Sequence, residues 1–261
     1  MSANIIAVAN QKGGVGKTTT TVNLAASLAA RNKRVLVIDL DPQGNATTGS
    51  GIDKASIGCG VYQVVLGEAE IKDAVIRSDS GRFDLLAANR ALAGAEVELV
   101  QEIAREVRLK NALKAVENDY DFILIDCPPS LTLLTLNGLV AANGVVVPML
   151  CEYYALEGIS DLIATVRKIR QAINPNLEVL GIVRTMYDAR SRLVAEVSDQ
   201  LQQHFGGLLF DTTIPRNIRL AEAPSHGMPA LAYDASAKGA RAYLELADEL
   251  LGRLGRLNRP A

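Results

Sequence analysis

The chain has 261 residues, enough for one large α/β domain or two small ones with a sizeable core. Its formal net charge is -2, so bulk charge predicts no polyanion partner, and any nucleic-acid binding must come from a local basic patch. No run of about 18 apolar residues occurs and no basic leader precedes the first apolar run. We therefore expect neither a membrane span nor a signal peptide, and we expect a cytoplasmic protein.

Cysteine and histidine spacing argues against metal or disulfide chemistry. Cys59, Cys127 and Cys151 form no CxxC pair and are odd in number, which is atypical of a disulfide framework or a zinc site. We interpret all three as structural, since free cysteine is commonly a buried packing residue. His204 and His226 lie far apart without ligand spacing, and we assign neither a metal nor a catalytic role.

Apolar, β-rich runs alternate with segments of helical periodicity along the whole chain. This alternation predicts βαβ units around a parallel sheet that is buried on both faces. Because no linker or repeat divides the chain, residues 1–261 are expected to form a single doubly wound α/β domain, with a mostly parallel sheet and helices on both faces. Only residues 49–82 are left without a clear assignment. Strands are expected at residues 5–9, 35–39, 83–87, 122–126, 144–148, 179–185 and 208–214, and helices at residues 18–31, 96–116, 131–142, 156–173, 191–204 and 235–254.

A glycine-rich loop with the sequence QKGGVGKTT follows the first expected strand and precedes a helix. Glycines accept positive φ and let backbone N–H groups approach phosphate oxygens, and the helix N-terminus adds partial positive charge. Lys17 should reach the β- and γ-phosphates of ATP, and the Thr18 hydroxyl should bind Mg²⁺. The loop is a variant of the P-loop motif GxxxxGK[ST], since Gln11 replaces its first glycine. The predicted nucleotide contacts are Lys12, Gly13, Gly14, Val15, Gly16, Lys17, Thr18 and Thr19.

A dinucleotide-binding fold is the main competing interpretation of this loop. Gly14 and Gly16 open a helix, and Asp39 ends the next strand at roughly the spacing of a ribose-binding carboxylate. However, Thr19 occupies the place of the third glycine, and a Lys-Thr pair stands where the pyrophosphate needs close backbone approach. Both features favour a P-loop NTPase.

Carboxylates end two of the expected strands. Asp126 closes the apolar run at residues 122–126, and two prolines break the strand directly after it. This is the pattern of a Walker B aspartate, which holds Mg²⁺ opposite Thr18. Asp39 and Asp41 end the second strand two residues apart, so that both side chains point to the same side in extended geometry.

Taken together, these motifs resemble those of the ParA/Soj partition ATPases, within the deviant Walker A group that also holds MinD-type and nitrogenase-iron-type proteins. The phosphate loop is shared by the whole group, and the later motifs narrow the family. The resemblance covers nearly the whole chain. It is carried by KGGVGKTT at 12–19, DLDPQGNAT at 39–47, DCPPS at 126–130, EYYALEG at 152–158, TMYDAR at 185–190 and IPRNIRLAEAPSHG at 214–227.

The resemblance implies roles for four residues around the phosphates. Lys12 would cross a dimer interface to the nucleotide of the partner, as a cation supplied in trans. Gly13 would be the position where a side chain blocks that approach. Asp41 would orient the attacking water, and Asp39 would support the magnesium shell, unless it only caps the following loop as strand-end aspartates often do.

The adenine site is also inferred from the resemblance. It implies a base pocket near Met186, Pro215 and Asn217. Asn10, at the end of the first strand, resembles a residue that supports the loop, and we interpret it as structural.

The implied activity is a slow, Mg²⁺-dependent hydrolysis of ATP by a homodimer that forms with ATP. The dimer would bind double-stranded DNA nonspecifically through Arg190 and Arg219, and so lie on the nucleoid when ATP is bound. A ParB-type centromere-binding protein would stimulate hydrolysis, and the cargo would be a chromosome or a plasmid. As alternatives, Arg190 could simply be solvated before a helix, and Arg219 could be structural beside the base pocket.

Three other functions remain as alternatives. A MinD-like membrane-associated positioning ATPase needs a C-terminal amphipathic helix, and residues 246–259 carry leucines and arginines. Gly252 and Gly255 weaken that helix, and the leucines fit the packing face of a core helix, so we expect no membrane binding. An iron–sulfur reductase needs cysteines paired across a dimer, and only Cys127 lies beside the nucleotide motifs. A scaffold that binds ATP without hydrolysing it is disfavoured by Asp41.

Overall fold

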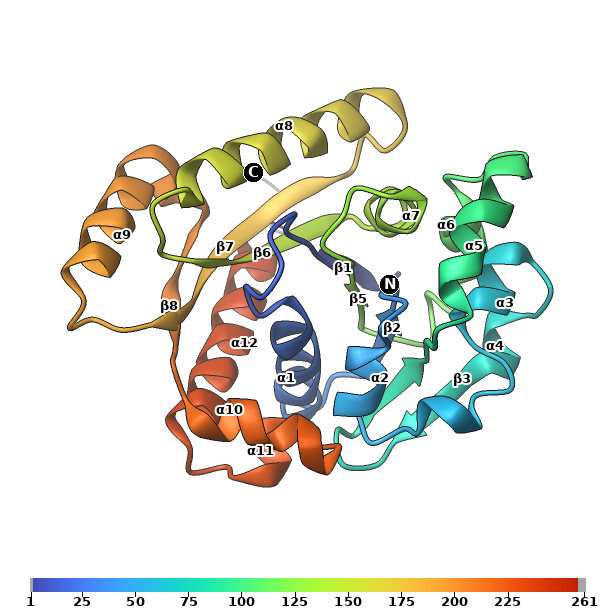
Figure 1. Cartoon of the computed structure of the whole chain (residues 1–261), viewed down its shortest axis with the longest axis horizontal. Helices are drawn as coiled ribbons and strands as arrows, with labels where there is room; N and C mark the ends of the chain where they lie inside the picture. The colour runs from blue at the N-terminus through green and yellow to red at the C-terminus, as the bar shows by residue number, and fades with distance from the viewer. Residues whose placement is uncertain (1, 258–261) are drawn as a thin grey trace.

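Eight strands form one sheet in a computed structural model of the protein, which describes residues 2–257 (Figure 1). The strand order is β3-β4-β2-β5-β1-β6-β7-β8, and every neighbouring pair is parallel except β3 with β4. The strands are β1 Asn4–Val8, β2 Val35–Asp39, β3 Val75–Ser78, β4 Phe83–Leu86, β5 Phe122–Asp126, β6 Gly144–Leu150, β7 Glu178–Tyr187 and β8 Leu209–Pro215.

Helices cover both faces of this sheet, and the longest of them were expected from the sequence. Helices α1 and α12 pack side by side on one face, and α7 and α8 cover the other (Figure 1). The α-helices are α1 Lys17–Ala30, α2 Asn45–Gly49, α3 Val61–Leu66, α4 Ile71–Ala74, α5 Leu92–Glu98, α6 Arg108–Leu113, α7 Leu133–Ala141, α8 Ala155–Ala172, α9 Arg192–Phe205, α10 Ile218–Glu222, α11 Ala230–Tyr233 and α12 Lys238–Leu257.

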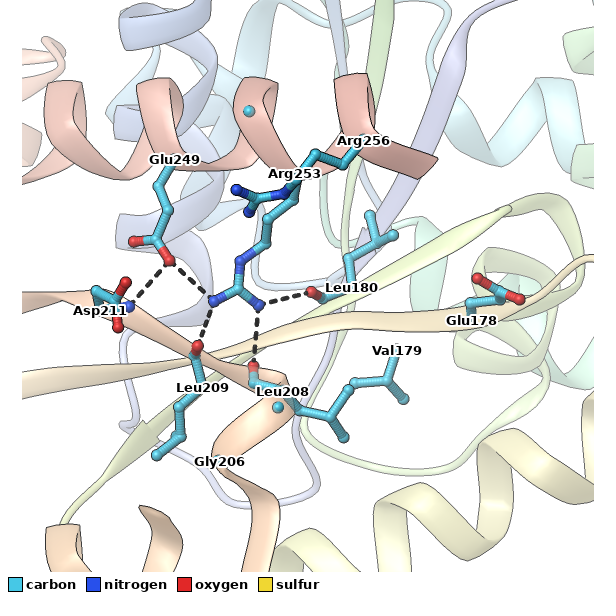
Figure 2. Close-up of a pocket in the computed structure, with 12 residues that line it drawn as sticks. Glu178, Val179, Leu180, Gly206, Leu208, Leu209, Asp211, Glu249, Arg253 and Arg256 are labelled. Carbon is cyan, nitrogen blue, oxygen red and sulfur yellow. Dashed lines mark hydrogen bonds and ion pairs between the residues drawn. The ribbon is translucent and has the colours of Figure 1, made fainter. Parts of the chain in front are cut away.

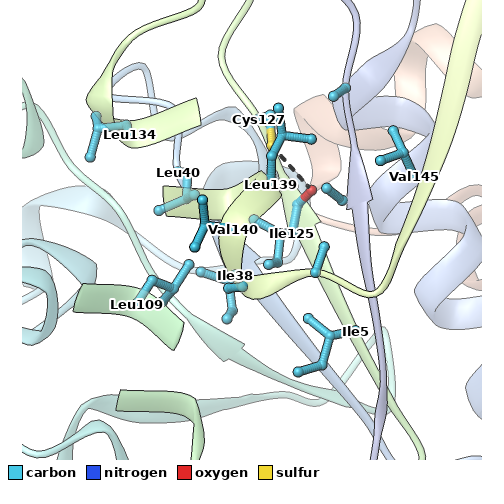
Figure 3. Close-up of a cluster of buried hydrophobic side chains, with 14 of the residues drawn as sticks. Ile5, Ile38, Leu40, Leu109, Ile125, Cys127, Leu134, Leu139, Val140 and Val145 are labelled. Atoms are coloured by element: carbon cyan, nitrogen blue, oxygen red, sulfur yellow. Dashed lines mark hydrogen bonds between the residues drawn. The ribbon is translucent and has the colours of Figure 1, made fainter. Parts of the chain in front are cut away.

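The central strands are buried on both faces. In β5, Ile123 and Ile125 belong to one apolar cluster, while Phe122 and Leu124 belong to the cluster on the opposite face. Figure 3 shows part of the first cluster, where Ile125 packs among side chains of β2 and α7. Because both faces exclude water, these strands need apolar residues at every position, which explains their unbroken apolar runs. The predicted doubly wound, mostly parallel fold is confirmed.

The single helix predicted over residues 96–116 is wrong. Helices α5 and α6 are separated by a segment in which Ala104 has a φ of 54°, in the left-handed region. The side chain of Asn137 on α7 donates to the Arg105 carbonyl at 2.7 Å and accepts from the Leu109 amide at 3.1 Å. These tertiary hydrogen bonds replace helical ones, so the continuous apolar periodicity does not correspond to one continuous helix.

Residues 49–82, which had no assignment, contain helices α3 and α4, a 3-10 helix at Lys54–Ser56 and strand β3. Strand β3 runs antiparallel to β4 at the edge of the sheet. It is only four residues long and only one of them is fully buried, so it lacks the apolar run by which the central strands were recognised.

The leucines of α12 form a packing face. Leu246 and Leu250 are buried against the sheet, and Leu251 and Leu254 pack partly against the same cluster. This confirms the interpretation of these four leucines as core residues. The side chain of Leu257 and residue Arg259 lie outside the described part of the chain. No helix within residues 2–257 is long and apolar enough to cross a membrane.

The arginine of α12 that faces the sheet is engaged by the protein itself. A cavity of about 640 Å³ lies between α12 and the adjoining ends of β7 and β8 (Figure 2). At its wall, the Arg253 guanidinium donates to the carbonyls of Leu180 at 3.2 Å, Leu208 at 3.3 Å and Leu209, and pairs with Glu249 at 2.9 Å. These bonds direct Arg253 toward the protein rather than toward an external anion.

Candidate nucleotide site

The loop between β1 and α1 has the backbone shape of a phosphate cradle. Gly14 and Gly16 have φ values of 73° and 85°, in the left-handed region that favours glycine. The Thr185 hydroxyl on β7 donates to the Val15 carbonyl at 2.8 Å and so ties the loop to the sheet. A Cβ atom at Gly13 would meet no atom within 4 Å, so that position is open in one protomer. The loop lies where the direction of the crossovers reverses, because the chain runs from β1 to β2 on one side and from β5 to β6 on the other side of β1. Such a switch point is the usual ligand position in parallel sheets.

Lys17 places a largely buried ammonium group at the centre of this loop. The residue is 7% exposed, and its Nζ donates to the Lys12 carbonyl at 3.0 Å. Burial lowers the pKa of Lys17, and the nearby carboxyl groups of Asp126 and Asp41 offset this only in part. A buried cation is costly without an opposite charge beside it, and the oxygens of a bound phosphate would supply that charge.

Asp126 meets Thr18 beside the loop, as the Walker B interpretation requires. Its Oδ2 accepts from Thr18 Oγ1 at 2.7 Å, and its Oδ1 accepts from Thr21 Oγ1 at 3.0 Å. Burial and the nearby Asp39 raise the pKa of Asp126, a cost that a bound cation would relieve. Hydroxyl and carboxylate oxygens are ligands that Mg²⁺ prefers, so these residues fit the ion. Residues 2–257 contain no cluster of three or more His, Cys, Asp or Glu side chains that could hold a metal by themselves. Phosphate and water oxygens would therefore complete the coordination shell of Mg²⁺ around Thr18 and Asp126.

Asp39 and Asp41 have different surroundings. Asp39 lies opposite Asp126 in the β2–β5 register and is fully buried. Its Oδ2 accepts from both the amide and the hydroxyl of Thr47 at 2.8 Å, and its Oδ1 accepts from the Asp41 amide at 3.1 Å. Asp39 therefore supports the loop after β2, and its part in a magnesium shell stays a prediction. The half-buried Asp41 accepts from the Gln43 amide at 2.9 Å and is near enough to Lys17 for their charges to interact.

Lys12 points away from the loop that it belongs to. Its ammonium is half-exposed and forms an ion pair with Glu152, in the connection between β6 and α8. Its amide donates to Asn10 Oδ1 at 3.0 Å, and Asn10 Nδ2 donates to the Pro148 carbonyl at 2.8 Å. Asn10 thus supports the loop, as expected. The sequence did not predict this ion pair, although Glu152 belongs to the motif EYYALEG that carries part of the family resemblance.

The residues predicted to contact adenine line one pocket. A cavity of about 260 Å³ opens beside Thr19, and Met186, Pro215 and Asn217 all contribute to its wall. Tyr243 of α12 also lines it, a residue that no sequence motif indicated. A mostly apolar pocket next to a phosphate cradle is suited to a purine base. The structure therefore brings the predicted base and phosphate residues together, and their contacts with nucleotide stay predictions.

The two arginines predicted to bind DNA follow the neighbouring strands β7 and β8. Arg190 is 90% exposed and pairs with Asp188 at 2.9 Å. Arg219 is 49% exposed and lies 2.7 Å from Glu222 and 3.5 Å from Asp234. Both are accessible at the carboxyl edge of the sheet, although each is partly neutralised by its own protein, and their role in DNA binding stays a prediction.

Comparisons with known proteins agree with this geometry. A family model described as an AAA domain matches residues 3–179. The sporulation initiation inhibitor protein Soj of Bacillus subtilis is 52% identical over 246 residues, covering 94% of this chain and 97% of Soj. The chromosome partitioning protein ParA of Caulobacter vibrioides is 47% identical over 258 residues, covering 97% of each chain. A Mycobacterium smegmatis structure named cobyrinic acid a,c-diamide synthase, with bound ATP analog and magnesium, superposes with a TM-score of 0.85 at 40% identity, covering 98% of this chain and 97% of that one.

Proposed function

The chain belongs to the ParA/Soj family of partition ATPases, and we propose that its ATP-bound homodimer binds DNA nonspecifically to segregate a chromosome or plasmid. Hydrolysis requires Mg²⁺ and is stimulated by a ParB-type centromere-binding protein. The observation that carries this proposal is the half-exposed Lys12 beside a complete phosphate site in which Lys17, Thr18 and Asp126 meet. The protein works in the cytoplasm and lies on the nucleoid when ATP is bound.

Each residue of the site has a distinct task. The loop amides and Lys17 would hold the phosphates, and Thr18 and Asp126 would hold magnesium, which would neutralise phosphate charge. Asp41 orients the attacking water. A carboxylate can position water without removing its proton, which suits slow hydrolysis that a partner can accelerate.

Lys12 links ATP binding to dimer formation. In the single protomer its own carbonyl accepts from Lys17, while its side chain is directed outward to Glu152. An outward cation next to the phosphate cradle is suited to reach phosphates in a second copy, in the manner of an arginine finger. Two such lysines would stabilise the dimer only when both sites hold ATP.

Lys12→Ala should therefore abolish the ATP-dependent dimer while preserving nucleotide binding by the monomer. Light scattering after size-exclusion chromatography, with and without a slowly hydrolysed ATP analogue, measures the dimer. Lys168→Ala, which removes an exposed lysine on α8, is the matched control and should dimerise normally. An ATP-dependent dimer of Lys12→Ala with wild-type affinity would contradict the role of this lysine in trans.

The alternatives have less structural support. Four of the leucines expected of a MinD-like membrane helix, Leu246, Leu250, Leu251 and Leu254, pack fully or partly against the sheet. Arg253 binds backbone carbonyls. Cys127 is buried and burial raises the pKa of its thiol, which opposes the thiolate that an iron–sulfur cluster needs. Asp41, placed beside the phosphate site, favours hydrolysis over a scaffold that only binds ATP.

DNA binding should depend on Arg219. In an Asp41→Ala background that holds the ATP dimer, Arg219→Glu should weaken duplex binding and reduce the salt dependence of the affinity. Each lost phosphate contact lowers the slope of log K against log salt by about 0.9, and a symmetric dimer loses two. Fluorescence anisotropy of labelled duplexes over a salt series measures both quantities.

The control for charge alone is Arg192→Glu, because Arg192 is an exposed arginine at the start of α9 that also pairs with a carboxylate of its own helix, Glu196. A smaller effect is expected there. Unchanged affinity and salt slope for Arg219→Glu, with its ATP dimer intact, would remove Arg219 from the DNA surface.

A further inference from the structure

Two tyrosines project into solvent from the connection between β6 and α8. Tyr153 is 77% exposed and Tyr154 is 71% exposed, and their rings form an edge-to-face pair with centroids 5.1 Å apart. The turn has a defined shape, since the Glu152 amide donates to the Leu150 carbonyl at 3.0 Å and the Ala155 amide donates to the Glu152 carbonyl at 2.9 Å. Adjacent exposed aromatic rings on an ordered turn are typical of a surface that another protein covers.

Glu152 joins this turn to the phosphate loop through its ion pair with Lys12. The backbone of Lys12 is held on both sides, because its carbonyl accepts from Lys17 and its amide donates to Asn10. Its side chain has no comparable restraint beyond the half-exposed pair with Glu152. A change of partner by Lys12 therefore needs only a side-chain rotation, without rebuilding the loop.

Because Tyr153 and Tyr154 lie beside the Glu152 partner of Lys12, the molecule that binds Lys12 is also the one expected to cover the two rings. If Lys12 leaves Glu152 for the phosphates of a second protomer, that protomer must come within one lysine side chain of Glu152. Tyr153 and Tyr154 directly follow Glu152 and expose large aromatic rings at this edge of the site. A second copy of this chain that accepts Lys12 is thus brought against the aromatic pair.

We propose that Tyr153 and Tyr154 form part of the surface that a second copy covers in the ATP-bound dimer, and that Glu152 holds Lys12 within its own protomer until then. This inference rests on the proposed function, because it requires the ATP-dependent dimer. In a two-fold symmetric dimer the turn of each copy lies at the interface, so every contact occurs twice. Covering the rings stabilises the dimer, and breaking two Lys12–Glu152 pairs opposes it.

The double variant Tyr153→Ser/Tyr154→Ser tests the aromatic surface. Its dimer Kd with a slowly hydrolysed ATP analogue should rise at least about tenfold, since buried tyrosines are frequent interface hot spots. ATP affinity of the monomer and the thermal unfolding midpoint should not change, because both rings are exposed. Ile103→Ser, which removes an apolar group that is 90% exposed in the segment between α5 and α6, is the matched control and should dimerise normally.

Glu152→Gln tests the hold on Lys12. Without the carboxylate no ion pair has to break in either protomer, so the dimer Kd should fall roughly two- to thirtyfold. Glu157→Gln, which removes an exposed charge from the first turn of α8, should leave the Kd unchanged. An unchanged or higher Kd for Glu152→Gln would overturn the holding role.

Analytical ultracentrifugation of these full-length variants, beside the wild type, separates the two proposals. A wild-type protein that stays monomeric with the ATP analogue overturns the proposed function and this inference together. A wild-type dimer with an equally stable dimer of the tyrosine variant overturns the inference alone. Weaker dimerisation by the tyrosine variant only, with Ile103→Ser unaffected, is the expected result.

Discussion

Replacing Lys17 by alanine should abolish productive ATP binding while leaving the fold intact. Lys17 is a largely buried residue whose ammonium lies within the phosphate loop, where it donates to the Lys12 carbonyl. Hydrogen bonds to charged groups contribute about 1.5–3 kcal/mol each, and Lys17 should bind both the β- and γ-phosphates. The loss of both corresponds to a rise in Kd of roughly a hundredfold or more. Isothermal titration calorimetry with a slowly hydrolysed ATP analogue and Mg²⁺ measures this change.

Lys12→Ala is the natural comparison, because it removes the other lysine of the same loop. It should keep the ATP affinity of the monomer, since its ammonium points to Glu152 rather than to its own phosphate site. A near wild-type affinity for Lys17→Ala would mean that loop amides alone hold the phosphates. An equal loss of ATP affinity in Lys17→Ala and Lys12→Ala would instead show that both lysines bind the phosphates within one protomer.

Asp41→Ala should trap an ATP-bound dimer that cannot turn over. If Asp41 orients the attacking water, its loss should lower the rate of hydrolysis by about 10²- to 10⁴-fold. ATP binding and dimer formation should persist, because the carboxylate is half-buried and its hydrogen bond to Gln43 lies within the same turn. Phosphate release in the presence of DNA and the ParB-type partner, with light scattering on the same samples, measures both effects.

Asp39→Ala separates this role from simple support of the loop. Asp39 is fully buried and accepts three hydrogen bonds, two of them from Thr47, so its loss should lower thermal stability as well as activity. Asp41→Ala should unfold at the wild-type temperature. Hydrolysis at the wild-type rate by Asp41→Ala would show that another group orients the water.

The fold class and the phosphate loop could be predicted from the sequence because their signals lie in short, contiguous segments of the chain. A strand, a glycine loop and a helix follow one another around Lys17, and the buried strands carry unbroken apolar runs. Asp126 was identified because a carboxylate at the end of such a run is costly to bury without a partner. The long helices, apart from the one expected at residues 96–116, could also be predicted, because the apolar periodicity that indicates a helix lies within one segment.

Contacts between distant segments were decided only by the tertiary structure. Lys12 and Glu152 are 140 residues apart, and they meet because β1 and β6 are neighbours in the sheet. Tyr243 reaches the base pocket because α12 packs beside α1. The periodicity of residues 96–116 predicts one continuous helix, but hydrogen bonds from the Asn137 side chain to the backbone of this segment outweigh its local helix propensity. Strand order and helix packing set these contacts, and no local pattern of residues encodes them.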